Sequence, residues 1–302
     1  MVALNLKQRP MMKLKKYTMN TAALIITAMM FGCSAKSDLN GSASSVMAMK
    51  ETAIEAQDAF FKHYDAEQVK QYFSPSYIQH NPHVPTGIAP VLGFLPVLKE
   101  AETTYRNHRL LVDGDFVIMH NTYHNAEAFG AKNVVAFDVW RMEDGKVAEH
   151  WDAIAPIVTE TASGRTQFDG PTTVVDIDKT QTNKKLIAAF MEDVFFGKAP
   201  EKIADYISTE QYDQHNIMVK DGLDGLNEAL SALAAQNNMF QYHKVHRILG
   251  EGNFVLTQSE GFWNGKSQAF YDLFRLDNGK IVEHWDVIQE IPAQMAHENG
   301  MF

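Results

Sequence analysis

The stretch FDVWRMEDGKVAEHWD at residues 137–152 returns as YDLFRLDNGKIVEHWD at residues 271–286, at a constant offset of 134. Each stretch alternates apolar and polar residues around a turn that contains glycine, which predicts a β-hairpin. Successive side chains of a strand point to opposite faces, so His150 and Asp152 should share one face of the sheet. A histidine and a carboxylate on one face of a buried sheet are candidates for proton-transfer chemistry.

The register of the first hairpin decides which side chains meet. A three-residue loop at residues 143–145, with glycine in a left-handed bulge, places Asp138 opposite His150. A two-residue turn would instead place Val139 opposite His150, because a slip of one residue exchanges the two faces. We favour the first register, because it gathers Asp138, His150 and Asp152 on one face and leaves an apolar face on the other side. An aspartate beside a histidine can set the imidazole tautomer and raise its basicity.

The duplication extends beyond the hairpins. Residues 77–81 (YIQHN) are answered by residues 212–216 (YDQHN), and residues 114–117 (GDFV) by residues 252–255 (GNFV). Each half places helical periodicity before its strands. The expected helices cover residues from about 47 to 73, 87–106, 186–196, 203–207 and 223–235.

Helices followed by strands are typical of the α+β class. We therefore predict two tandem domains, each with N-terminal helices packed on a curved antiparallel sheet and a pocket at its mouth. The predicted boundaries are a signal peptide at 1–33, a flexible tether at 34–48, domain 1 at 49–168, a linker at 169–181 and domain 2 at 182–302.

The N-terminal residues are typical of an export signal. Lys13, Lys15 and Lys16 precede an uncharged, mostly apolar run at residues 21–31, which is followed by Gly32-Cys33. This run is too short for a comfortable membrane span, and Gly32-Cys33 resembles a bacterial lipobox. We expect cleavage before Cys33, lipid on its sulfur and a location in the cell envelope, on the periplasmic side of a bacterial membrane. An uncleaved anchor or a plain signal peptide are the alternatives.

Composition excludes several classes of function. Outside the first 33 residues the chain has 22 basic and 37 acidic side chains, so its surface repels nucleic acid. The chain contains one cysteine, which excludes an intrachain disulfide. The sequence shows no glycine-rich phosphate loop and no nucleophile elbow. The His80-Asn81-Pro82-His83 segment is answered by His-Asn-Ile-Met, so we predict neither a cofactor nor a metal.

Residues 77–82 (YIQHNP) and 141–152 (RMEDGKVAEHWD) resemble the SnoaL-like polyketide cyclase branch of the NTF2-like superfamily, and the second half resembles another copy. The resemblance implies an α+β cone. That superfamily includes aldol-type cyclases, ketosteroid isomerases, epoxide hydrolases and proteins with no known activity. In the cyclases an aspartate on a pocket strand moves the proton α to a carbonyl, and Asp152 and Asp286 match this position.

We therefore predict a cofactor-free lyase or isomerase that acts on a small apolar carbonyl compound. The candidate site residues are Asp152, His150, Asp138 and His80 in the first half and Asp286, His284, Asp272 and His215 in the second. Structural alternatives remain open: hydrogen bonds that close the sheet end, satisfied core histidines and turn caps. The alternative function is a non-catalytic envelope lipoprotein that binds a small ligand. Either function is compatible with an intramolecular pseudo-dimer that is monomeric in solution and touches the membrane only through its lipid.

Overall fold

The computed structural model describes residues 34–302, so the predicted signal peptide and Cys33 lie outside the described residues. Within 34–302 no helix is long and apolar enough to cross a membrane. Both sheets described below belong to one compact unit, residues 42–302.

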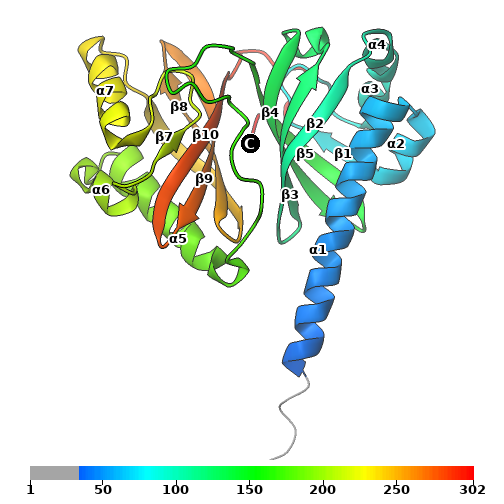
Figure 1. Cartoon of the computed structure of the whole chain (residues 1–302). Helices are drawn as coiled ribbons and strands as arrows, with labels where there is room; N and C mark the ends of the chain where they lie inside the picture. Colours follow the sequence, from blue (N-terminus) through cyan, green and yellow to red (C-terminus); the bar gives the residue numbers. More distant parts are fainter. Residues whose placement is uncertain (1–33) are drawn as a thin grey trace, which may run out of the picture. The chain divides into compact units, whose positions relative to one another are not determined.

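From residue 34 onward, the first half contains four α-helices and five strands, with a π-helical turn at Ala59–His63. Figure 1 shows how these elements are arranged. They are α1 (Ser34–Asp58), α2 (Ala66–Tyr72), β1 (Phe73–Gln79), α3 (Ile88–Gly93), α4 (Leu95–Glu100), β2 (Thr104–Asp113), β3 (Phe116–His124), β4 (Asn133–Glu143) and β5 (Lys146–Pro156). The break before α2 lies at Tyr64, whose φ is 50°, and Asp65 then caps α2 by accepting hydrogen bonds from the backbone of Glu67 and Gln68.

The second half repeats this order (Figure 1). Its elements are α5 (Thr180–Phe190), α6 (Ile203–Tyr206), β6 (Asp213–Gln214), α7 (Gly222–Ala235), β7 (Gln241–Glu251), β8 (Phe254–Trp263), β9 (Lys266–Asp277) and β10 (Lys280–Glu290). A π-helical turn at Met191–Phe195 follows α5, as a π-helical turn follows α1 in the first half.

Two predicted segments differ from the structure. The segment 34–48, predicted as a flexible tether, belongs to α1, since it contains no proline and only one glycine to interrupt a helix. The helix predicted at 87–106 is divided at Phe94 and ends at Glu100, because Pro96 lacks a backbone N–H and therefore lies in the first turn of a new helix. Strand β2 then takes the β-favouring residues from Thr104 onward.

Each half builds one five-stranded sheet. The strand orders are β1-β5-β4-β3-β2 and β6-β10-β9-β8-β7. The first-named strand of each sheet runs parallel to its neighbour, and the other neighbouring pairs are antiparallel. Helices and predominantly antiparallel sheets in one chain confirm the predicted α+β class.

The predicted register of the first hairpin is wrong. Asp144 and Gly145 form a two-residue turn, with φ angles of 51° and 72°, and Glu143 pairs with Lys146. Such a turn suits Asp-Gly because both central residues need positive φ. The pairing then shifts by one residue at Ala148, so that Asp138 lies opposite Asp152 rather than His150.

This shift is a β-bulge, and it restores the faces that the turn alone would exchange. Trp140 therefore lies opposite His150, and Asp138, His150 and Asp152 share a face as predicted. The second hairpin has the same construction: Asn278 and Gly279 turn with positive φ, and the shift recurs between Ile281 and Glu283.

The two faces of each sheet pack against different partners. In the first half, the face with Ala136 and Trp140 packs beneath the helices. The opposite face carries Val139 and Trp151 and shares one core with side chains of the second sheet, such as Leu273 and Trp285. Burial of each large apolar side chain stabilises this contact by roughly 1.5–3 kcal/mol.

Candidate functional site

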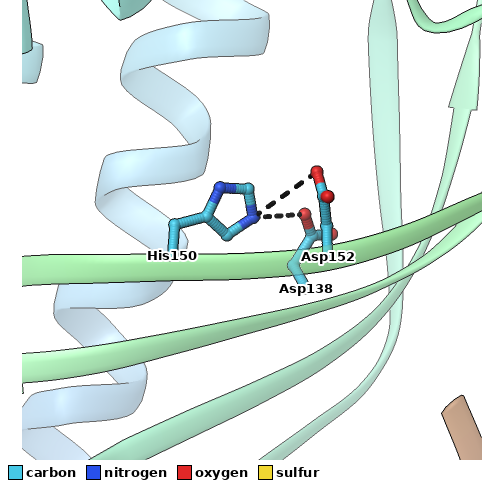
Figure 2. A group of neighbouring side chains, drawn as sticks. All are labelled: Asp138, His150 and Asp152. Carbon is cyan, nitrogen blue, oxygen red and sulfur yellow. Dashed lines mark hydrogen bonds and ion pairs between the residues drawn. The ribbon is translucent and has the colours of Figure 1, made fainter. Parts of the chain in front are cut away.

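Three side chains meet on the helix-covered face of the first sheet. Asp138 comes from β4, and His150 and Asp152 come from β5. His150 Nε2 lies 3.1 Å from Asp138 Oδ1 and 3.9 Å from Asp152 Oδ2. In Figure 2 the imidazole ring points toward both carboxylates. The bulge in β5 permits this meeting, because without it His150 would turn to the other face.

Neighbouring amides and a phenol hold the two carboxylates in place. Asn81 Nδ2 donates to both oxygens of Asp152, at 3.0 and 2.8 Å. Asp138 Oδ2 accepts hydrogen bonds from Asn121 Nδ2 and from the hydroxyl of Tyr123, each at 2.8 Å. Both aspartates are buried, with 5% and 4% of their surface exposed. The cluster is therefore a fixed constellation rather than a solvated group of charges.

The cluster lies in the wall of a cavity of about 460 Å³. Asp138, His150 and Asp152 all line it. Aromatic side chains supply much of the remaining wall, including Phe60, Phe61, Phe73, Tyr77, Phe94 and Trp140. Among the described residues that line this cavity, none is a lysine or an arginine. Such a wall suits an uncharged, largely apolar ligand that places a polar atom near the carboxylates.

Burial and mutual charge shift the titration of this cluster. Burial raises the pKa of Asp152, and the neighbouring charge of Asp138 raises it further, against the opposing effects of His150 and Asn81. Burial alone would lower the pKa of His150, but its hydrogen bond to Asp138 and the charges of both aspartates raise it overall. A carboxyl group with a raised pKa is suited to take and return a proton near neutral pH.

A second cluster occupies the corresponding place in the second half. Asp272 lies opposite Asp286, and His284 Nε2 is 3.1 Å from Asp272 Oδ1. Asn216 Nδ2 donates to Asp286 at 2.5 Å, as Asn81 does to Asp152. The pKa of Asp286 is raised by burial, and the pKa of His284 is raised by Asp272 and Asp286 despite burial.

An aromatic pair, Phe270 and Tyr242, lies beside the second cluster. Phe270 takes the position of Ala136, since each lies opposite an isoleucine of the following strand, Ile288 and Ile154 respectively. The ring of Phe270 packs 4.4 Å from that of Tyr242, whose hydroxyl lies within 3.3 Å of both oxygens of Asp272.

The phenol that contacts the first aspartate of the cluster comes from a different strand in the first half. Tyr123, which holds Asp138, pairs with Val134, and the corresponding pair in the second half is Gly261 with Gln268. The second half therefore has no phenol at this position, and Tyr242 reaches Asp272 from the neighbouring strand β7 instead.

His80 follows β1 directly and lies outside the cavity wall, and its side chain contacts Glu149 whereas that of Asn81 contacts Asp152. Its ring stacks on Trp151 at 4.7 Å, and the guanidinium of Arg247 from the second half lies 4.0 Å from the other face of this indole. His80 Nε2 is 2.8 Å from Glu149. His80, a candidate site residue from the sequence, therefore does not line this cavity.

His215 has the same arrangement in the second half. It stacks on Trp285 at 4.6 Å, and Arg109 of the first half lies 4.0 Å from that indole. Its Nε2 is 2.9 Å from the fully buried Glu283. Each half thus supplies an arginine to the other half's tryptophan, and both histidines serve the contact between the sheets.

The structure brings six of the eight predicted residues into the two clusters, and it adds Asn81, Asn121 and Tyr123 to the first. Asn81 had a sequence signal, because its motif is repeated at Asn216. Asn121 and Tyr123 had none, since their contact with Asp138 depends on the pairing of β3 with β4.

Each cluster also offers three ligand atoms within 4.8 Å of one another, a set that suits a divalent cation. In the first cluster, however, donors from Asn81, Asn121 and Tyr123 already engage the carboxylate oxygens. This environment favours proton transfer over metal coordination.

Comparison with known proteins identifies a family signature in the first half. Residues 54–150 match the family described as "SnoaL-like domain". No curated protein matches the chain in sequence. Similar solved structures include TsrD from Streptomyces laurentii, with 21% identity over 36% of this chain and 88% of that chain, at a TM-score of 0.31.

Two further similar structures are candidate polyketide cyclases. The protein from Bacillus cereus ATCC 10987 is 18% identical over 35% of this chain and 74% of its own, with a TM-score of 0.32. IdmH from Streptomyces antibioticus is 18% identical over 35% of this chain and 91% of its own, with a TM-score of 0.30. By sequence, residues 54–150 of this chain are similar to the SnoaL-like domain family.

Proposed function

We propose that the chain comprises two tandem SnoaL-like domains, of which the first is a cofactor-free lyase or isomerase that moves a proton α to a carbonyl. One observation carries this proposal: the Asp138–His150–Asp152 cluster lies in the wall of an aromatic cavity of about 460 Å³. The substrate is a small apolar carbonyl compound. The matching order of strands in the two sheets supports the tandem arrangement.

In the proposed reaction the carboxylate of Asp152 takes a proton from the carbon α to the carbonyl. The electrons of the broken C–H bond form an enolate, and the protonated Asp152 returns the proton to carbon. In a cyclase reaction the enolate carbon would instead attack a second carbonyl of the same molecule, and the protonated Asp152 would give its proton to the alkoxide oxygen formed there. His150, held by Asp138, stabilises negative charge beside the reacting carbon.

Tyr77 is placed to assist at the substrate oxygen. It lines the cavity, and its hydroxyl accepts a hydrogen bond from Gln79 Nε2 at 3.0 Å. Within residues 34–302 no acceptor is seen for its own proton, so the O–H group can donate to a carbonyl oxygen that becomes negatively charged.

The experiment is α-deuterium exchange of a ketone probe, 2-tetralone, in D2O. Asp152→Asn should slow exchange by at least about 100-fold, because an amide cannot accept the proton. Asp286→Asn is the matched control and should leave the rate within about twofold. Exchange should also rise with pH through the raised pKa of Asp152, since only the ionised carboxyl accepts a proton.

Two outcomes would overturn this assignment. Unchanged exchange in Asp152→Asn would remove Asp152 from the reaction. Binding of the ketone by the wild-type protein with no exchange above background would leave a ligand-binding protein instead.

A further inference from the structure

The cavity of the first half has one wall residue from the second half, Gln289 of β10. Its Oε1 accepts a hydrogen bond of 2.8 Å from the backbone N–H of Ile154, which also lines the cavity. The bond connects positions far apart in the chain and fixes the amide at the end of β5. The second half therefore takes part in the site that the first half builds.

This bond determines which way the amide of Gln289 points. A backbone N–H can only donate, so the atom facing Ile154 must be the side-chain oxygen. The NH2 group then points away from Ile154. Gln289 is partly exposed, and no acceptor for its NH2 group is seen in the described part of the chain. A half-exposed donor on a cavity wall is available to a ligand.

We propose that Gln289 determines specificity, donating a hydrogen bond from Nε2 to a carbonyl oxygen of the ligand. The proposal rests on the proposed function for the class of ligand, a small carbonyl compound. The aromatic wall accepts the apolar body of the ligand, and Gln289 adds a donor where the cavity has no lysine or arginine.

The arrangement is not reciprocal. The residue 134 positions before Gln289 is Ala155, which has no side-chain amide to offer the second half. Only the cavity of the first half therefore receives such an amide. This asymmetry favours a role in ligand binding over a role in packing the two sheets together.

The test compares the binding of 2-tetralone with that of tetralin, the hydrocarbon that lacks the oxygen, by ligand-observed NMR. Gln289→Leu should weaken the binding of 2-tetralone about tenfold and leave the affinity for tetralin within about twofold of the wild type. Gln289→Glu retains an oxygen acceptor for the Ile154 N–H but removes the donor. It should therefore keep the fold while losing the same preference for the ketone.

Glu290→Gln, at the exposed neighbouring position, is the control and should bind both probes as the wild type does. Equal weakening of both probes, or no weakening of 2-tetralone in either Gln289 variant, would overturn the inference. Because binding is measured directly, the result is independent of exchange. A protein without exchange that still prefers the ketone through Gln289 would contradict only the proposed chemistry.

Discussion

The two halves of this chain carry the same Asp–His–Asp cluster in different surroundings. His150 and His284 each lie 3.1 Å from an aspartate on the preceding strand. In the first half the cluster borders a cavity of about 460 Å³, whereas in the second Tyr242 contacts Asp272 and its ring packs on Phe270. The comparison shows that the cluster itself is compatible with a structural role. The cavity beside the first cluster is the feature that would allow a ligand to reach it.

The two halves carry different side chains at two positions near the cluster. Ala136 in the first half corresponds to Phe270 in the second, and Tyr123 corresponds to Gly261. Both halves have the Asp–His–Asp cluster and its hydrogen bonds at this end of the sheet. They differ in the side chains that pack beside the cluster. Exchanging Ala136 and Phe270 should therefore move the open space from one half to the other.

The largest effect is expected from Ala136→Phe, which gives the first half the side chain of the second. Ala136 lies opposite the wall residue Ile154, so the new ring is expected to enter the cavity and exchange of 2-tetralone should fall by at least about 100-fold. Circular dichroism should show an intact fold. Val135→Ile, a change on the opposite face of the same strand, is the size-increasing control and should retain exchange. Full activity in Ala136→Phe would show that the cavity is not where the ketone reacts.

Phe270→Ala should have a smaller effect and should open space in the second half rather than fill it. Removing this fully buried ring should cost about 3–5 kcal/mol of unfolding free energy, which urea denaturation measures. Tetralin should then restore part of the lost stability by filling the new space. A loss below about 1 kcal/mol would mean that Phe270 does not fill the second site.

Much of this architecture could be predicted from the repeated hairpin, and the errors have physical causes. The face shared by His150 and Asp152 follows from strand alternation, but the bulge at Ala148 does not, because one extra residue leaves little trace in an apolar Val-Ala pair. The predicted register is wrong for this reason. The two-residue turn and the bulge each shift the pairing by one residue, so the predicted faces are nevertheless right.

The misplacement of His80 has the same origin in alternation. His80 and Asn81 are neighbours directly after β1, and their side chains point to opposite sides, that of Asn81 to Asp152 and that of His80 to Glu149. Sequence reasoning favoured the histidine for its chemistry, whereas the structure gives the inward position to Asn81. The contribution of Gln289 could not be predicted, because it depends on how the two sheets pack.

The central claim is that the first half binds the ligand beside His150 and the second half does not. NMR of the histidine ring nitrogens tests it directly, with His150→Gln and His284→Gln used to assign the signals. In the free protein both rings should titrate above the ordinary pKa of histidine. On addition of 2-tetralone the His150 signals should move and those of His284 should stay. Equal movement of both, or movement of His284 alone, would contradict the account.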